Sequence, residues 1–279
     1  MTQTLPNLDL GAEARPFLKW VGGKRQLLPE LLARTPETFG AYHEPFVGGG
    51  ALFFELRALG RLGAVTLSDT NERLVRTWTA VRDRVEDVIA LLREGKNELP
   101  YFMAMRARDI DAEDDAAVAA WFIYLNKTAF NGLYRVNTKG KYNVPFGSYA
   151  NPNICDEGTL RAASQALQGV TIARRDFTEV LETAVPGDFV YFDPPYVPLS
   201  VSSSFTSYTR DGFSLGEQTL LRDVALKLKQ RGVHVLLSNS SAPQVYELYQ
   251  AFEVSEVQAT RAINSKASQR GAIAELVMR

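Results

Sequence analysis

The sequence is poor in cysteine and histidine. Cys155 is the single cysteine, and two histidines occur among the 279 residues. A lone cysteine excludes an internal disulfide and any cysteine-rich metal site. Such usage is typical of a reducing compartment, so we expect a cytoplasmic protein that holds no metal.

Long apolar runs and excess charge are also missing. No run of about 18 apolar residues occurs, so we expect no membrane span. The N-terminus lacks the basic-then-apolar pattern of a signal peptide, and we predict that residues 1–14 form a flexible polar tail. The formal net charge of −1 gives no global indication of a nucleic-acid partner.

What is present is an alternation of strand-like and helix-like segments. It predicts an α/β fold whose main domain comprises residues 15–74 and 151–279. Residues 75–150 interrupt it with helical segments and then, over 127–150, a hairpin of two short strands. The expected strands cover 42–46, 64–68, 170–174, 189–192 and 233–237, the expected helices cover 27–33, 51–59, 216–230 and 244–252, and two terminal strands close the sheet.

Three features predict one nucleotide-like ligand. A glycine-rich turn follows the first expected strand, and glycines let a ligand approach the backbone. Asp69 ends the next strand about 20 residues further on, where a carboxylate can accept hydrogen bonds from ribose hydroxyls. An aromatic and basic cluster with a glycine pair precedes both and is expected to line the other side of the pocket. The predicted pocket residues are Trp20, Gly22, Gly23, Lys24, Glu44, Pro45, Phe46, Gly48, Gly50 and Asp69.

Two other kinds of nucleotide ligand are alternatives for this pocket. NAD is a rival, because the spacing from the glycine turn to Asp69 suits it. A phosphate-binding loop of an NTPase is rejected, because no Gly-Lys-Ser or Gly-Lys-Thr sequence completes the Gly22–Lys24 fragment.

The tetrapeptide Asp193-Pro194-Pro195-Tyr196 follows the strand expected over 189–192. An exocyclic amine on adenine or cytosine is a poor nucleophile, because its lone pair is delocalised into the ring. Asp193 and the carbonyl of Pro194 are suited to accept both N–H groups, which aims the lone pair at an incoming methyl group. The prolines preorganise these acceptors, and Tyr196 offers a face for stacking the base. Hydride transfer has no evident use for such a site, which argues against NAD.

The tetrapeptide resembles the active-site signature of amino-group methyltransferases. The motifs together, in their order along nearly the whole chain, resemble the Dam family of DNA adenine-N6 methyltransferases, the alpha-ordered D12 class. Ser238-Asn239 is similar to a later family motif. The resemblance implies a Rossmann-like methyltransferase sheet with an inserted helical and β-hairpin target-recognition domain. It also implies S-adenosyl-L-methionine as the methyl donor and S-adenosyl-L-homocysteine as the product. It makes Asp193, Pro194, Pro195 and Tyr196 the catalytic residues, and Asp176, Phe177 and Asp193 further cofactor contacts.

The segment over residues 126–150 contains four basic side chains and no Asp or Glu. Arginine and asparagine can read guanine and adenine bidentately, and lysines suit phosphates. The segment resembles the Dam recognition hairpin, which implies that Phe130 wedges into the base stack. The expected DNA-binding residues are Lys127, Phe130, Asn131, Leu133, Arg135, Asn137, Lys139 and Pro145. A second basic stretch resembles the family's carboxyl-terminal segment and is expected to hold phosphates or the flipped strand; it carries Arg261, Lys266 and Arg270.

The resemblance implies double-stranded DNA as the partner and a flipped adenine in GATC as the target. Relatives with similar hairpins methylate longer sites beginning with GAT, so a longer target within a restriction-modification system, with a cognate endonuclease, stays open. Methylation of RNA adenine or of protein glutamine is a second alternative, although glutamine methyltransferases usually have Asn at the position of Asp193. A DNA-binding regulator without catalysis is disfavoured by the intact Asp193 and Tyr196. We expect a monomer associated with the nucleoid.

Overall fold

The structure is a computed structural model that describes residues 14–20, 22, 24–197, 213–260 and 272–279. Three predictions fall outside the described residues. These are the polar tail over residues 1–13, the pocket residue Gly23, and the basic stretch with Arg261, Lys266 and Arg270.

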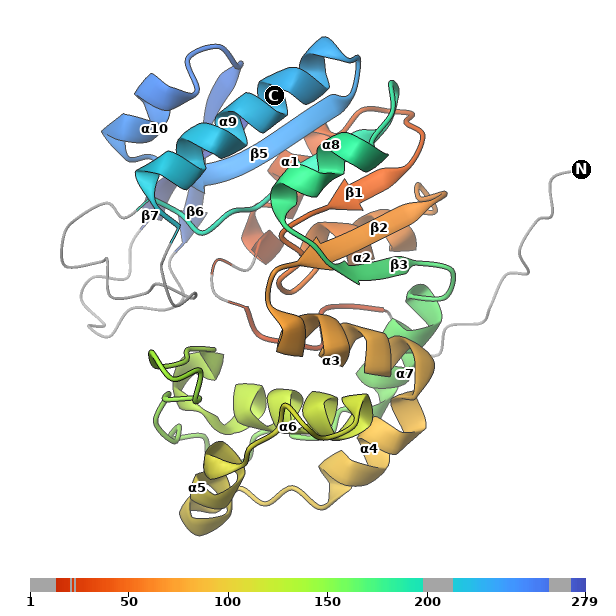
Figure 1. Cartoon of the computed structure of the whole chain (residues 1–279), viewed down its shortest axis with the longest axis vertical. Helices are drawn as coiled ribbons and strands as arrows, with labels where there is room; N and C mark the ends of the chain where they lie inside the picture. Colours follow the sequence, from red (N-terminus) through yellow and green to blue (C-terminus); the bar gives the residue numbers. More distant parts are fainter. Residues whose placement is uncertain (1–13, 21, 23, 198–212, 261–271) are drawn as a thin grey trace, which may run out of the picture.

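A seven-stranded sheet organises the main part of the molecule (Figure 1). Its order is β3-β2-β1-β4-β5-β7-β6. The first five strands of that order are parallel, whereas β7 is antiparallel to both β5 and β6. The chain moves from β1 through β2 and β3 to one side and resumes at β4 on the other side of β1, so the winding reverses between β1 and β4. The strands are β1 Tyr42–Glu44, β2 Val65–Asp69, β3 Thr171–Arg174, β4 Phe189–Phe192, β5 His234–Ser240, β6 Val254–Thr260 and β7 Ala272–Met278.

Both faces of this sheet are covered, which explains why its central strands are apolar throughout. Successive residues of a strand point to opposite faces, and Phe189 and Tyr191 accordingly join one hydrophobic cluster while Val190 and Phe192 join the other. The first cluster includes buried residues of α1 Leu28–Arg34 and α2 Ala51–Ala58. The second includes residues of α8 Val180–Thr183, α9 Leu215–Gln230 and α10 Pro243–Leu248.

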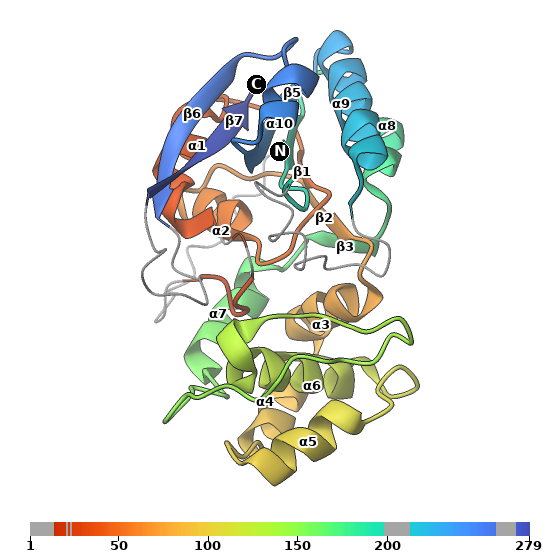
Figure 2. The ribbon, with the colours of Figure 1, turned by 90° about the vertical axis from the view of Figure 1, so that its left-hand side faces the viewer.

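A separate layer of helices lies beside the sheet and below it in Figure 2. Its centre is α6 Asp115–Thr128, which packs against α3 Glu72–Asp83, α4 Val85–Arg93 and α5 Leu99–Ala107. Most of α6 is buried, as an apolar helix surrounded by others must be. α7 Glu157–Ala166 packs against α3 and α4, and α3 also contacts β2 and β3. α3 therefore joins the helical layer to the sheet.

The prediction of two short strands over 127–150 is wrong, whereas the predicted reversal of the chain direction within this segment is confirmed. The segment forms isolated antiparallel bridges, Val136 with Tyr142 and Ala129 with Phe146, instead of two strands. The 3-10 turn η2 Phe130–Gly132 opens it, and Asn131 there has a φ of 55°. The interruptions follow from residues that break a ladder, since glycine weakens a strand and proline cannot donate to one. We keep the name recognition hairpin for residues 129–147.

Two element ends also differ from the prediction. β5 continues through Ser240, although the expected strand ended at residue 237, because Ser238 to Ser240 pair with β7. α10 ends at Leu248 and not at 252. The pairing that extends the strand past residue 237 comes from β7, near the end of the sequence.

The predicted domain limits at 74/75 and 150/151 stay predictions. α3 spans the first of them, and α7, beyond the second, packs with the helices of the insertion. In the part of the chain that the structure describes, no helix is both long enough and apolar enough to cross a bilayer.

Candidate active site

The candidate site lies where β1 and β4 end side by side. The winding of the sheet reverses between these strands, and ligands of open α/β sheets bind in the crevice at such a point. β1 is parallel to β4 and to β2, so the carboxyl ends of all three strands meet at one edge. Glu44, Asp69 and Asp193 stand at or just beyond those ends. The fold thus brings together three carboxylates that lie far apart in the sequence.

Lys24 forms a contact that the sequence did not predict. It was predicted to line the cofactor pocket, yet its Nζ lies 2.7 Å from Oδ1 of Asp193. The ammonium also donates to the carbonyl of Gly22 at 2.5 Å and lies 4.5 Å from the ring centroid of Tyr196. Lys24 is only 4% exposed, so the ion pair is largely screened from water. Gly22 and Lys24 therefore lie at one site with Asp193 and Tyr196.

A second hydrogen bond fixes the carboxylate of Asp193. Ser238 Oγ in the neighbouring β5 donates to Oδ1 at 2.8 Å, and the Tyr191 hydroxyl lies 3.0 Å from the same Oγ. Lys24 and Ser238 both contact Oδ1, and together they hold the carboxylate in one orientation.

The loop after β4 is clamped through its backbone. Gln218 of α9, which is fully buried, donates from Nε2 to the carbonyl of Pro195 at 2.9 Å. Asn239 donates from Nδ2 to Oε1 of Gln218 at 3.0 Å and accepts from the N–H of Val197 at 3.2 Å. These bonds act on the residues after Pro194 and do not involve its carbonyl. The clamp preorganises the acceptor carbonyl that the tetrapeptide chemistry needs.

Tyr196 is hydrogen-bonded to β7, the strand on the other side of β5 from β4. Its hydroxyl donates to Oε2 of Glu275 in β7 at 2.7 Å, while Lys24 lies over its ring. Burial raises the pKa of the Tyr196 hydroxyl well above its usual value, so it stays protonated and able to donate. Neither Glu275 nor Gln218 was predicted, because one lies in a terminal strand and the other on an amphipathic helix, where nothing local marks them.

The glycine-rich turn after β1 has no room for side chains. Gly50 has a φ of 63° and Gly48 a φ of 45°, both in the left-handed region that favours glycine. A Cβ on Gly50 would lie 2.5 Å from Trp78, and one on Gly48 would lie 2.6 Å from the indole of Trp20. α2 begins directly after Gly50, so its N-terminal N–H groups face the same edge of the sheet.

The two carboxyl groups beside this turn differ from ordinary surface acids. Glu44 is 3% exposed and accepts a hydrogen bond from the Tyr42 hydroxyl at 2.9 Å. Burial raises the pKa of Glu44 to about 8. Burial also raises the pKa of Asp69 to about 6, although its carboxylate accepts from the N–H of Asn71 at 2.9 Å. Pro45 is buried between Glu44 and the turn.

Phe46 and Phe177 form an aromatic wall next to the turn. Their ring centroids are 5.4 Å apart and the rings are nearly parallel, at 24°. Asp176 is exposed and caps the 3-10 turn η3 Phe177–Glu179, since its carboxylate accepts from the N–H of Thr178 at 2.9 Å. The glycine cradle, the acid at the end of β2 and this wall fit a ligand with a ribose and an aromatic base. Among the described residues, no cluster of His, Cys, Asp and Glu could hold a metal ion.

The recognition hairpin is attached to the amino-terminal cluster. Asn126 exchanges two hydrogen bonds with the backbone of Lys19, at 2.8 and 2.7 Å, and Gly132 packs so closely that a Cβ there would lie 2.7 Å from the Lys19 side chain. Trp20 packs against both Phe122 and Tyr134, with its ring 6.3 Å from each of theirs. The hairpin therefore starts at a fixed place beside the candidate site.

The predicted DNA-binding residues differ in how far they reach the surface. Lys127 lies partly buried in the last turn of α6, and burial lowers its pKa. Arg135 is exposed, and its Nε donates to Oδ1 of Asn143 at 2.8 Å. The exposed members are Phe130, Arg135, Asn137, Lys139 and Pro145, and the partly buried ones are Lys127, Asn131 and Leu133.

The strand order and the site together define a class of protein. A sheet that reverses between β1 and β4, with a glycine turn after β1, an acid after β2 and Asp-Pro-Pro-Tyr after β4, is a Rossmann-like methyltransferase sheet.

Comparison with known sequences gives the family. Residues 20–263 match the family described as D12 class N6 adenine-specific DNA methyltransferase, and the chain belongs to it. The protein is therefore an adenine-specific DNA methyltransferase, with DNA as its substrate, and methyltransferases of this kind generally use S-adenosylmethionine.

Three relatives illustrate the similarity, and each aligns over nearly its whole length. The Type II methyltransferase M1.LlaDCHI of Lactococcus lactis subsp. cremoris is 43% identical over 95% of this chain and 94% of its own. The Type II methyltransferase M.MjaIII of Methanocaldococcus jannaschii is 40% identical over 92% of this chain and 96% of its own. The DNA adenine methylase of Escherichia coli strain K12 is 32% identical over 94% of each chain.

Proposed function

We propose that the protein transfers a methyl group from S-adenosylmethionine to N6 of an adenine flipped out of duplex DNA, within GATC. The observation that carries this proposal is the Asp193 carboxylate, held through Oδ1 by Lys24 and Ser238 beside the clamped Pro194-Pro195 backbone. A rigid pair of acceptors suits an amine with two N–H groups. Adenine inside a duplex cannot reach such a recessed site without leaving the stack.

The residues around the glycine turn would hold the methyl donor. Gly48 and Gly50 leave backbone space, Asp69 would accept hydrogen bonds from ribose hydroxyls, and the wall of Phe46 and Phe177 would flank the base. Trp20, Gly22 and Glu44 complete the near side, and Asp176 remains a predicted contact at the rim. When bound, the donor supplies a methyl group already activated by its sulfonium.

The chain's own task is to position the target nitrogen. Asp193 Oδ2 and the carbonyl of Pro194 accept the two N–H groups and hold the nitrogen near tetrahedral geometry. The nitrogen gives up one proton as it gains the methyl group, and the Asp193 carboxylate is the adjacent acceptor. Lys24 lies over one face of Tyr196, so a base would stack on the other face, a contact of about 1–3 kcal/mol.

The exposed part of the recognition hairpin would read the duplex. The hydrogen bond to Asn143 orients the guanidinium of Arg135, which could then read a base. Phe130 is 41% exposed, and Lys139 suits a phosphate. Asn131, Leu133, Asn137 and Pro145 flank these residues as further candidate contacts.

Methylation-dependent cleavage tests the proposal. Unmethylated plasmid is incubated with the protein and labelled S-adenosylmethionine, then digested with one nuclease that GATC methylation blocks and one that requires it. We expect protection from the first and cleavage by the second. The Asp193→Asn variant serves as the inactive control. Label in RNA or protein but not in DNA would contradict the proposed substrate.

A longer target site is the second candidate. The two Type II methyltransferases are 43% and 40% identical to this chain, more than the 32% of the Escherichia coli methylase. Under this candidate the plasmid takes up label while GATC cutting is unchanged, methylation-aware sequencing reveals a longer motif, and a cognate restriction endonuclease is expected as a partner. Under both candidates we propose a cytoplasmic monomer acting at the nucleoid; light scattering with and without DNA would test the monomer.

A further inference from the structure

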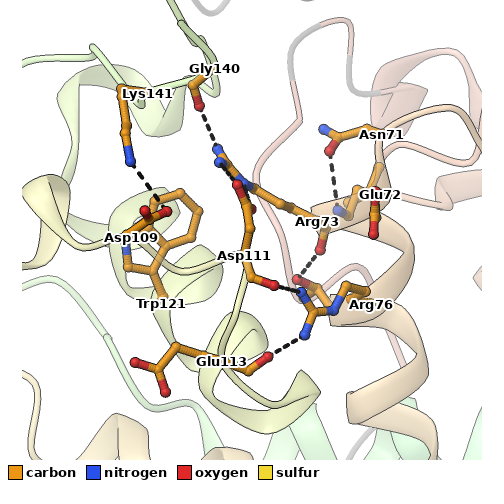
Figure 3. Close-up of polar contacts among 12 residues, drawn as sticks. Asn71, Glu72, Arg73, Arg76, Asp109, Asp111, Glu113, Trp121, Gly140 and Lys141 are labelled. Carbon is orange, nitrogen blue, oxygen red and sulfur yellow. Dashed lines mark hydrogen bonds and ion pairs between the residues drawn. The ribbon is translucent and has the colours of Figure 1, made fainter.

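Arg73 stands at the junction of the sheet, the helical layer and the recognition hairpin. It lies in the first turn of α3, directly after the turn that carries Asp69 and Asn71. Figure 3 shows its side chain reaching from α3 to the loop at Asp111 and to Gly140 at the hairpin tip. The side chain is 14% exposed, so it is not an ordinary surface arginine.

Each N–H face of this guanidinium is engaged. Nε and Nη2 donate to the two carboxylate oxygens of Asp111 at 2.6 and 2.7 Å, a bidentate pair. Nη1 donates to the carbonyl of Gly140 at 2.9 Å. The guanidinium carbon lies 5.4 Å from the ring centroid of Trp121 in α6. One planar group thus joins the acidic loop to the hairpin tip.

Tyr134 extends the connection back to the candidate site. Burial raises the pKa of the Tyr134 hydroxyl, and the neighbouring side chains of Arg73 and Asn71 act in the opposite direction. The Tyr134 ring lies 6.3 Å from that of Trp20. Asn71 in turn donates from its N–H to Asp69. A continuous chain of contacts therefore runs from the ribose-binding turn to the hairpin tip.

The base of the hairpin packs into the core through Tyr142 and Val144, whereas few described contacts from outside the hairpin reach its tip, residues 137–141. The hairpin residues form isolated bridges and no strands, and Gly140 has a φ of 71° in a tight turn. Lys141 makes an ion pair with Asp109 at 3.2 Å, but both side chains are about half exposed or more, and exposed pairs contribute little. Among the described contacts, the partly buried bond from Arg73 to Gly140 is the hydrogen bond that reaches the tip from outside the hairpin.

We propose that Arg73 is a positioning residue that fixes the recognition hairpin relative to the ribose-binding turn and thereby sets target discrimination. It touches neither base nor cofactor in this arrangement; it acts through the orientation of the hairpin on which Arg135 and Asn137 stand. The inference rests on the proposed function, because it requires that the hairpin read DNA.

Arg76 provides a matched control on the same helix. Its Nε lies 2.6 Å from Oδ1 of Asp115, and its Nη1 donates to the Asp111 carbonyl at 3.0 Å. It therefore ties the same acidic loop to α3 without a described contact to the hairpin (Figure 3). Loss of either arginine weakens the packing of the loop, and only loss of Arg73 releases the tip.

The test compares kcat/KM on a duplex with the site found by sequencing and on duplexes with one base pair changed. For Arg73→Gln we expect the ratio between them to fall on the order of tenfold, with kcat on saturating cognate DNA within about threefold of wild type. Arg76→Gln should keep the wild-type ratio even if its melting temperature falls as much as that of Arg73→Gln. Equal ratios for both variants, or an unchanged ratio in Arg73→Gln, would overturn the inference.

Two further variants separate geometry from charge and protect against misfolding. Arg73→Lys keeps the charge but cannot form the bidentate pair and reach Gly140 together, so its ratio should stay low; full recovery would show that charge alone matters. Tyr134→Phe keeps the ring stacking and removes the hydroxyl beside Arg73 and Asn71, and we expect a smaller fall of the ratio. If wild type methylates no DNA adenine, the proposed function itself fails, which is a different outcome from a wild-type enzyme whose discrimination is indifferent to Arg73.

Discussion

At the scale of single residues, the Lys24–Asp193 pair is the central feature. Sequence patterns put Lys24 with the cofactor motif and Asp193 with catalysis, and the structure joins them at 2.7 Å. A buried charge without its partner destabilises a protein, by about 3–5 kcal/mol in typical cases. Substitutions at Asp193 therefore affect stability as well as chemistry, and the two effects have to be separated.

Asp193→Asn should remove activity and cost less stability than Asp193→Ala, because the amide oxygen can still accept a hydrogen bond from the Lys24 ammonium. The amide retains the size of the side chain but loses the charge that accepts from the amine, so we expect methyl transfer to fall at least about 100-fold. Asp193→Ala should also lower the free energy of unfolding, because Lys24 is left unpaired, and adding Lys24→Met should recover part of it. Urea unfolding and methyl-transfer rates check this. Full stability in Asp193→Ala would argue against a stabilising ion pair.

Glu44 should make stability depend on pH. Its pKa rises from 4.5 in the unfolded chain to about 8 on folding, so the folded state binds the proton more tightly, and its contribution to stability falls as pH rises between those values. Asp69 titrates near 6 and is already ionised above that, so the comparison runs from pH 6.5 to 8.5. Wild type should lose about 2 kcal/mol over this range relative to Glu44→Gln. Parallel stability curves for the two proteins would refute the shift.

At the scale of elements, the turn between β1 and α2 combines backbone and packing constraints. The carbonyl of Gly48 accepts from the Trp78 indole at 3.2 Å, which attaches the turn to α3. Because α3 also carries Arg73, one helix supports both the cofactor turn and the hairpin tip.

Gly50→Ala should damage this turn specifically. The new Cβ would lie 2.5 Å from Trp78 at a φ of 63°, and we expect a loss of about 2–4 kcal/mol together with weaker cofactor binding. Gly60→Ala is the control, since its φ is 67° but nothing lies within 4 Å of the Cβ, so only the backbone cost of about 1 kcal/mol applies. Calorimetric titration and urea unfolding measure both. Equal cofactor affinity in the two variants would contradict the packing argument.

At the scale of the whole molecule, a protein of net charge −1 has to bind a polyanion through one face. We propose that the acid-free hairpin supplies that face. The acidic side chains of the α5–α6 loop are paired with basic ones, as Asp111 is with Arg73 and Asp114 is with Arg84. Local charge therefore outweighs the net charge in deciding the partner.

Arg135 and Lys139 should contribute differently to DNA binding. Arg135→Ala should reduce the preference for the cognate duplex by about 1–3 kcal/mol. Lys139→Ala should weaken all duplexes alike and reduce the slope of log K against log salt by about 1. Binding to cognate and scrambled duplexes at several salt concentrations distinguishes the two roles. An Arg135→Ala variant that loses affinity for both duplexes equally would not be a base-reading variant.

The sequence by itself determined the α/β class, the glycine turn, the acid after β2 and the tetrapeptide after β4. Each of these is a local pattern, set by strand periodicity and by residues with special backbone demands, so it can be read along the chain. The prediction was right for β4 over residues 189–192 and short for β5, whose end depends on pairing with β7.

Only the tertiary structure decided which distant residues meet. Four contacts join parts of the chain that are separated in sequence. They are Lys24 with Asp193, Gln218 with Pro195, Glu275 with Tyr196, and Arg73 with Gly140. Such contacts depend on how strands order themselves and how helices pack across them, and no local periodicity encodes that. The sequence indicated which residue types could carry the proposed chemistry. The tertiary structure showed which contacts orient those residues and hold them in place.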